Sequence, residues 1–472
     1  MNPITIPNIS IPTIGIPTIG IPSVGFPSAS GGGGLSWPAG MKEHIKAWYD
    51  PKKQGMTNYD VIEAYVEDFT NWNYVKARGV ATISQHKFII TECILKGLSI
   101  VEDIQEPYSN LTVRIIGITD NQEVLITDYV NGQHQIINTI TEDGIYTIED
   151  GIYTIEDRHH FVGFGCNFVG TCNITIEQLP TSILKDLSGN GNHAYLYGGK
   201  GKLNSGMGVY QQDFSKLIIS RVDKKQDPFS FTVSGSGGSY LAYMQLGNWN
   251  NKAFKILANI NAKSDYLYLR FRNSTDAVIT SVMLKNGENI IPAQNIEGAT
   301  KAVFEYSLKE GETITVTQIP DYPDQLCYDG KMYAVCYGFP ILTDYTVMTE
   351  RTWFENRNVF LAKGNITTEA KYAFIFERFK PDGVMTVQSF GAWNDVVSTT
   401  DSCISYLTKN KYNGIDIRSG IGADDDMLSI GGALNKGNIE LTSVCCHGAI
   451  IVADRSFTEE EINWLKQNWD KI

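Results

Sequence analysis

The segment Asn173-Ile-Thr-Ile-Glu-Gln-Leu-Pro180 has a second copy in the chain, Thr313-Ile-Thr-Val-Thr-Gln-Ile-Pro320. Each copy ends a stretch of about a hundred residues rich in β-forming side chains, residues 58–180 and 228–320. Apolar and polar residues alternate in both copies, which predicts a strand, and the closing proline cannot donate into a further ladder. We therefore predict two copies of one small β-sandwich.

The rest of the chain has the same β-rich character. Short alternating runs recur between clusters of Gly, Asn and Asp, for example at 112–116, 266–271, 302–306 and 373–377. The composition agrees, with 24 Tyr, 20 Phe and 44 Gly among 472 residues. This pattern predicts an all-β protein built of sandwiches.

A shorter duplication lies inside the first predicted sandwich. Glu142-Asp-Gly-Ile-Tyr-Thr-Ile is followed directly by Glu149-Asp-Gly-Ile-Tyr-Thr-Ile. An insertion of seven residues within a strand would turn every later side chain to the opposite face, because seven is odd. The duplication is therefore predicted at a strand end or in an exposed loop.

Three pieces remain when the predicted inserts are removed: 35–57, 181–227 and 321–472. The last piece ends in a predicted helix, with a capping box formed by Thr458 and Glu461. Ile462, Leu465 and Trp469 give it an apolar stripe at helical spacing. Because so short a helix is marginal alone, we expect it to dock on a sheet.

These pieces carry a resemblance to a known fold. Asp186-Leu-Ser-Gly-Asn-Gly-Asn-His-Ala, followed by Tyr195-Leu-Tyr-Gly, resembles the early turn of laminin-G-like, concanavalin-A-type jelly rolls. Ile451-Val-Ala-Asp-Arg-Ser-Phe-Thr-Glu-Glu-Glu-Ile-Asn-Trp-Leu resembles the last strand and helix of that fold, and Ile45-Lys-Ala-Trp-Tyr-Asp its first strand. The resemblance implies one discontinuous, concanavalin-A-like lectin jelly roll interrupted by two inserted small β-sandwiches.

A second resemblance covers nearly all of residues 42–472. It rests on Lys46-Ala-Trp-Tyr-Asp-Pro-Lys-Lys-Gln-Gly-Met-Thr-Asn-Tyr, on Leu184-Lys-Asp-Leu-Ser-Gly-Asn-Gly-Asn and on Tyr322-Pro-Asp-Gln-Leu-Cys-Tyr-Asp-Gly. These segments resemble fibre-type virion proteins of crAss-like phages of Bacteroidales. The resemblance implies a virion surface component that recognises host glycans, and it leaves a head fibre and a tail fibre as alternatives.

Residues 1–34 differ from everything that follows. The first 41 residues contain no charged side chain, and a proline recurs every five residues from Pro7 to Pro27. Proline at this spacing excludes a helix and favours an extended chain. The large apolar side chains of the repeat, which fall on several sides of any extended conformation, are Ile6, Ile9, Ile11, Ile14, Ile16, Ile19, Ile21, Val24 and Phe26.

An extended arm that is apolar on several sides needs a covering in water. We expect residues 1–34 to anchor the chain to other virion proteins, in the capsid or tail, and to promote self-association as a homotrimer. The run from Gly31 to Gly34 would then form a flexible joint. A disordered linker is the alternative for this segment.

Charge and hydropathy argue against several partners. The net charge of −13 argues against nucleic acid, whose binders need a basic face. No apolar run approaches 18 residues, so membrane insertion is not predicted. The N-terminus lacks the basic region and unbroken apolar run of a secretory signal. We therefore expect a protein made in the host cytoplasm and localised to the virion.

No metal or cofactor is expected from the sequence. The eight cysteines include no Cys-x-x-Cys pair, and most lie in apolar runs typical of buried free thiols. Asp186-x-Ser-x-Asn-Gly resembles the start of a calcium loop, but its twelfth position is Tyr197, so a tight turn is predicted. The three carboxylates of 424–426 are predicted to lie in a solvated loop. Calcium is the alternative at both places.

We expect no enzymatic activity and name no catalytic residue. Glycosidases need two carboxylates that face each other across a cleft, and no strand here carries an alternating Glu, Asp and Glu array. Gly-x-Ser-x-Gly and His-Glu-x-x-His motifs are also absent from the sequence.

Two tryptophan turns have the composition of sugar-binding sites, in which an aromatic face lies beside amides or acids. The candidates are Trp249 with Asn250, and Trp393 with Asn394 and Asp395. At each place a tryptophan packed at a sandwich end is the alternative, while Trp48, Trp464 and Trp469 are predicted to be core residues.

The sequence thus favours a virion fibre that binds host-surface polysaccharide. A free or host-surface lectin is the alternative, and a glycosidase is less favoured.

Overall fold

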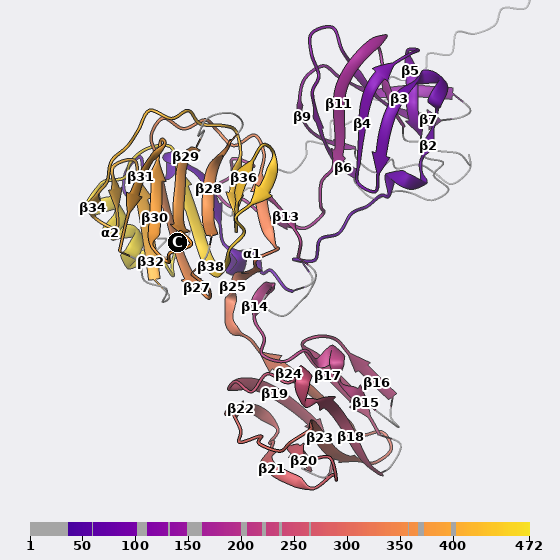
Figure 1. The fold of residues 1–472 in the computed structure, drawn as a ribbon, viewed down its shortest axis with the longest axis vertical. Helices are drawn as coiled ribbons and strands as arrows, with labels where there is room; N and C mark the ends of the chain where they lie inside the picture. The colour runs from indigo at the N-terminus through magenta and orange to yellow at the C-terminus, as the bar shows by residue number, and fades with distance from the viewer. Residues whose placement is uncertain are drawn as a thin grey trace, which may run out of the picture.

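Antiparallel sheets form nearly all of the computed structural model, which shows an all-β protein of three bodies (Figure 1). It describes residues 36–58, 60–101, 111–130, 133–148, 163–199, 205–219, 223–235, 238–263, 266–356, 358–366, 372–397 and 403–472. The anchoring arm predicted at 1–34 lies outside the described residues, as does the second copy of the short duplication. The first copy forms β9, the edge strand of its sheet.

The first insert is a sandwich of two five-stranded sheets. One sheet, in spatial order, contains β2 (Asn73–Tyr74), β5 (Gly97–Val101), β10 (Gly163–Cys166), β7 (Val124–Val130) and β8 (Gln133–Ile140). The other contains β3 (Gly79–Ser84), β4 (Lys87–Cys93), β11 (Gly170–Gln178), β6 (Leu111–Ile116) and β9 (Gly144–Ile148).

The second insert repeats this arrangement. One sheet contains β15 (Ile218–Ile219), β18 (Gly238–Gln245), β23 (Lys301–Leu308), β20 (Leu267–Arg272) and β21 (Val278–Met283). The other contains β16 (Asp223–Gln226), β17 (Ser230–Ser234), β24 (Thr313–Ile319), β19 (Phe254–Asn261) and β22 (Gly287–Ile291). Numbered along the chain, the described strands of both inserts have the same order, 1-4-9-6-7 in one sheet and 2-3-10-5-8 in the other.

The two cores repeat as well. Three phenylalanine rings contact one another pairwise in each insert, with centroids 5.1 to 6.4 Å apart. They are Phe69, Phe88 and Phe164 in the first insert and Phe214, Phe231 and Phe304 in the second. Equal strand order and equal core positions make the inserts two copies of one fold.

The second insert begins earlier than residue 228. Strands β15 and β16 pair within its sheets, and Phe214 lies in its core. A short aspartate-capped turn starts each insert: Asp68 accepts from the amide of Thr70, and Asp213 from that of Ser215. The turns share the pattern Asp-Phe-Ser/Thr, so this sequence signal marks the start of each copy.

Two larger sheets form the central sandwich, which has a jelly-roll-like form. The eight-stranded sheet contains β14 (Gly206–Val209), β25 (Asp321–Asp329), β38 (Val444–Ala453), β27 (Thr346–Trp353), β32 (Cys403–Thr408), β33 (Lys411–Tyr412) and β34 (Ile415–Asp416), and β1 (Ile45–Tyr49) also pairs with β38. The ten-stranded sheet contains β12 (Ile183–Leu184), β13 (Ala194–Tyr197), β26 (Tyr333–Cys336), β35 (Leu428–Ile430), β28 (Asn358–Ile366), β29 (Tyr372–Phe379), β30 (Met385–Ser389) and β31 (Ala392–Asp395), with β36 (Ala433–Asn435) and β37 (Asn438–Glu440) beside β28.

Strands from all three pieces of the chain meet in the core of this sandwich. Tyr49, Leu196 and Leu326 come from different pieces and lie in one buried cluster. Val61 belongs to the same cluster, so the connection to the first insert starts a few residues after 57. The observed connectivity is therefore discontinuous, as the sequence predicted.

Helix α2 (Glu459–Asn468) begins at the predicted capping box and docks on the outer face of the eight-stranded sheet. Ile462, Leu465 and Trp469 are buried there, and Trp48 and Trp464 pack against the cluster while remaining half-buried. A second, shorter helix, α1 (Pro51–Gln54), follows β1 and is capped by Asp50.

The cysteines only partly follow the expectation of free thiols. Cys93 at the end of β4 and Cys166 in β10 form a disulfide between the two sheets of the first insert. The two cysteines are 73 residues apart in the sequence, so no local pattern indicated that they pair. Cys327, Cys336, Cys445 and Cys446 are buried free thiols.

Candidate binding surface

Trp393 lies on β31, the edge strand of the ten-stranded sheet, and its side chain is half-buried. It stands opposite Gln388 of β30, which stands opposite Ile375 of β29. Directly opposed side chains share a face of a sheet. Ile375 and Trp393 belong to an apolar cluster separate from the central core. The ring therefore lies on the outer face of the sandwich.

Two polar atoms beside this ring have no hydrogen-bond partner among the described residues. The guanidinium of Arg378 lies over Trp393, 5.1 Å from the ring centroid, and its Nε is buried and unpaired. Gln388 is 1% exposed, and its Oε1 is likewise buried and unpaired. Each such atom costs about 1–3 kcal/mol, because it is shielded from water without a protein partner.

The neighbouring polar residues are ordered by pairing. Asn394 accepts from the amide of Arg418 through Oδ1 and donates to the carbonyl of Arg418 through Nδ2, both at 2.9 Å. Asp395 pairs with Lys380 at 2.7 Å, and both side chains reach solvent. We define the Trp393 surface as Trp393, Arg378, Gln388 and Asp395. Asn394 stands opposite Val387, a residue of the central core, so its side chain lies on the other face of the sheet.

The structure thus places the predicted Trp393 and Asp395 on the outer face of one short strand, and the predicted Asn394 on its core-facing side. Sequence reasoning missed Arg378 and Gln388, because they come from β29 and β30 and join the site only through sheet register. Their only sequence signal is a polar residue within an otherwise apolar strand.

The other predicted tryptophan lies in a core. The ring of Trp249 is 8% exposed and packs edge-on against Phe254 and Phe271. Asn250 exchanges hydrogen bonds with Gln212 and also donates to Gln211. Trp249 therefore offers no exposed face for a sugar ring, and the packed alternative describes this position.

Asp186 organises the tight turn predicted around it. Its two carboxylate oxygens accept from the amides of Trp48, Ser188 and Asn192 and from the Ser188 hydroxyl. Asn190 donates to the carbonyl of Ile45. Because the carboxylate already accepts these protein donors, the turn serves to fasten β13 to β1.

Within the run 424–426, Asp424 departs from the solvated loop expected from its charges, whereas Asp426 is exposed. The Asp424 carboxylate is 1% exposed and pairs with the fully buried Lys363 at 3.0 Å. Burial raises the pKa of Asp424, which Lys363 opposes. Over the described part of the chain, no group of three or more His, Cys, Asp or Glu side chains is placed to hold a metal ion.

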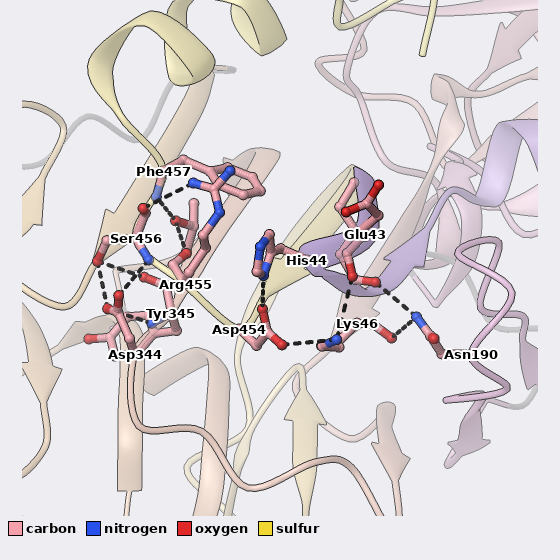
Figure 2. Close-up of polar contacts among 12 residues, drawn as sticks. Glu43, His44, Lys46, Asn190, Asp344, Tyr345, Asp454, Arg455, Ser456 and Phe457 are labelled. Atoms are coloured by element: carbon pink, nitrogen blue, oxygen red, sulfur yellow. Dashed lines mark hydrogen bonds and ion pairs between the residues drawn. The ribbon is translucent and has the colours of Figure 1, made fainter. Parts of the chain in front are cut away.

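A polar seam joins β1 to the end of β38 (Figure 2). Asp454 accepts from Lys46 at 2.9 Å and pairs with His44 Nδ1 at 2.7 Å. Burial opposes ionisation of Asp454, but these two partners hold its pKa below the ordinary value. Among the described residues, no hydroxyl or thiol side chain bonds His44, so the pair lacks the nucleophile of a hydrolytic triad.

A polar hollow of about 300 Å³ lies where α1, β25 and the C-terminus meet. Lys52 pairs with Asp324 at 2.8 Å, and Gln325 donates to Glu350. Burial, and then the charge of Asp470, raises the pKa of Glu350. The other lining residues are Asp50, Lys53, Tyr322, Pro323, Gly448, Ala449 and Trp469.

Comparisons with known proteins give distant likenesses. No protein-family model and no curated protein matches the chain. The N-terminal CBM22-1–CBM22-2 tandem domain of a Paenibacillus barcinonensis protein is 10% identical, with 55% of this chain and 96% of that chain covered and a TM-score of 0.19. Trypanosoma rangeli sialidase in complex with sialic acid is 9% identical, with 85% and 84% covered and a TM-score of 0.25.

No helix in the described residues is long and apolar enough to cross a membrane.

Proposed function

We propose that this chain is a virion fibre protein whose central sandwich binds host-surface polysaccharide through the Trp393 surface. The observation that carries the binding site is the half-buried Trp393 ring on the outer face, with the guanidinium of Arg378 5.1 Å from its centroid and the exposed Asp395 in the same row of the sheet as Arg378. A sugar stacks its C–H face on an aromatic ring and hydrogen-bonds through its hydroxyls. The Trp393 surface supplies both kinds of contact.

The charges at this surface indicate which class of polysaccharide it would prefer. Arg378 and Lys380 stand beside the ring, while Asp395 is the one carboxylate among the residues of the Trp393 surface. Asp395 is already paired with Lys380, so the guanidinium of Arg378 carries the uncompensated charge. We therefore expect a polysaccharide with acidic groups to bind more tightly than a neutral one.

The fibre role rests on the sequence rather than on the described residues. The apolar arm at 1–34 suits burial between copies of the chain or in a groove of another virion protein, and the resemblance to phage fibres supports the same role. A homotrimer joined by three arms would present three Trp393 surfaces to one host cell, which raises the effective concentration of each.

Binding of purified full-length protein to immobilised capsular polysaccharides from Bacteroidales strains tests the site. Trp393→Ala and Arg378→Gln should weaken binding at least tenfold, about 1.4 kcal/mol. Ile415→Ala, an exposed apolar residue on the edge of the opposite sheet, is the matched control and should bind normally. Equal binding by wild type and Trp393→Ala would remove the surface from the proposal.

A further inference from the structure

A second surface, unrelated to Trp393, lies on the outward face of the second insert. In β20 the side chains of Leu267, Leu269 and Phe271 point into the core and are fully buried. The alternating residues Tyr266, Tyr268, Arg270 and Arg272 point outward and are partly exposed. Two aromatic and two cationic side chains thus run along one strand.

Sheet register adds residues of the same kind. Glu305 of β23 stands opposite Tyr268, and Lys301 stands opposite Arg272. Tyr243 of β18 and Arg270 of β20 both stand opposite Val303 of β23, so the three residues lie in one row across the sheet. We define the tyrosine–arginine face as Tyr243, Tyr266, Tyr268, Arg270, Arg272, Lys301 and Glu305.

Glu305 holds the centre of this face in one arrangement. Its carboxylate accepts from the Tyr266 hydroxyl at 2.7 Å, from Arg270 at 2.8 Å and from Arg272 at 2.5 Å. Burial opposes ionisation, but these donors outweigh it and lower the pKa of Glu305. The guanidinium of Arg270 also lies over the Tyr268 ring, 4.7 Å from its centroid. The side chains are therefore ordered before any ligand arrives, which reduces the entropy cost of binding.

The face carries excess positive charge that reaches solvent. The side chains of Arg270 and Arg272 are 22% and 18% exposed. Lys301 pairs with Asp276, which leaves the two arginines to share the single charge of Glu305. One positive charge is thus uncompensated, on a chain whose net charge is −13.

We propose that the tyrosine–arginine face binds a linear anionic polysaccharide, with sugar rings on the tyrosines and carboxylates at Arg270 and Arg272. An outward sheet face matches an extended chain, and guanidinium groups pair with carboxylates in a fixed fork geometry. The exposed side chains of Leu241 and Met283 border the face and would contact apolar sugar edges. A single-stranded nucleic acid would use similar groups, but one uncompensated charge on an acidic chain is too little to hold a phosphate at every nucleotide.

Binding of full-length protein to polygalacturonate, a polymer of uronic acid, tests this at 50 and 300 mM salt. Wild type should bind, and more weakly at high salt. Tyr268→Ala and Arg270→Gln should each lose at least tenfold in affinity. Met283→Glu, at a side chain that is 50% exposed, leaves the Glu305 network intact and should also weaken binding. Met283→Glu therefore still tests the face if Tyr268→Ala or Arg270→Gln fails to fold.

Two controls separate this face from other sites. Lys255→Gln removes an exposed charge from the opposite sheet of the same insert and should bind normally. In a Trp393→Ala background, Tyr268→Ala and Met283→Glu should each weaken binding by the same factor as in the wild-type chain. Loss of polygalacturonate binding in Trp393→Ala, with Tyr268→Ala and Met283→Glu unaffected, would overturn the inference. So would absent binding by wild type, or tighter binding to single-stranded DNA than to polygalacturonate.

Discussion

Gln178 and Gln318 make the same pair of hydrogen bonds at the points where the chain enters the two inserts. The Oε1 of Gln178 accepts from the amide of Glu67, and its Nε2 donates to the carbonyl of Glu67. Gln318 makes both bonds to Gln212. Glu67 and Gln212 each directly precede the aspartate-capped turn that starts their insert. In each insert, one buried amide therefore joins the incoming chain to the last strand.

We expect Gln178→Ala and Gln318→Ala to destabilise their own inserts, each by about 1–3 kcal/mol, because buried backbone groups lose their partners. The change should appear as faster limited proteolysis near residues 64–67 or 210–213, respectively, before global unfolding. Gln211→Ala, one residue from Gln212 but at exposed hydrogen bonds, is the control. Uniform loss of stability over all three bodies would contradict the prediction that each glutamine stabilises its own insert.

His447 should make the central sandwich sensitive to acid. It is fully buried, its Nδ1 lies 2.7 Å from the carbonyl of Gly448, and its Nε2 lies 3.0 Å from the Tyr328 hydroxyl. Burial lowers its pKa to about 4. Because the folded state prefers the neutral ring, the stabilisation is complete above the unfolded pKa of about 6.5 and is lost as pH falls toward 4, by up to about 3 kcal/mol.

Chemical unfolding between pH 7 and pH 4 measures this dependence. His447→Gln should show a smaller loss of unfolding free energy over that window than wild type. An unchanged slope in His447→Gln would show that other groups set the acid response.

Arg351 and Glu377 form a fully buried ion pair inside the central sandwich. Glu377 also accepts from Trp353 and Tyr412, so the carboxylate is surrounded by donors. Removing one partner leaves a buried charge alone, and we expect Arg351→Met or Glu377→Gln to cost about 3–5 kcal/mol in unfolding free energy. Lys380→Gln, which breaks the exposed pair with Asp395, should cost less than about 1 kcal/mol in the same denaturant titration. Similar losses for both pairs would refute the burial argument.

Deleting residues 1–34 should leave a folded protein that no longer assembles into virions. Nine large apolar side chains, each contributing about 1.5–3 kcal/mol when fully buried, would be lost from the anchor. Occupancy on purified virions and the mass of the free protein in solution measure the effect, with a trimer expected only for the full chain. Normal occupancy of the truncated protein would rule out anchoring by the arm.

Local sequence signals were sufficient where the determining interactions are local. The capping box at Thr458 and Glu461 predicted the start of α2, because its hydrogen bonds span three residues. The repeated Gln-Leu/Ile-Pro ending predicted two related inserts. The start of the second insert was missed at Asp213, since its turn is short and Gln318, which bonds the preceding Gln212, lies about a hundred residues later.

Trp249 and Trp393 show the limit of the sequence. Both lie two residues after a glycine and directly precede an asparagine, yet Trp249 is buried while Trp393 lies half-buried at a sheet edge. Their exposure depends on the rings and strands that arrive from elsewhere in the chain: Phe254 and Phe271 around Trp249, and Arg378 beside Trp393. Composition could name both as candidates but could not distinguish them.

By itself, the sequence determined the all-β class, the two related inserts and the docked helix, because alternation, strand endings and caps act over a few residues. Only the tertiary structure decided which polar groups remain unpaired. Arg378 meets Trp393 through the register of three strands, and Arg270 meets Glu305 across two. Sheet register depends on the packing of whole faces, and that packing is a property of the folded chain rather than of any segment.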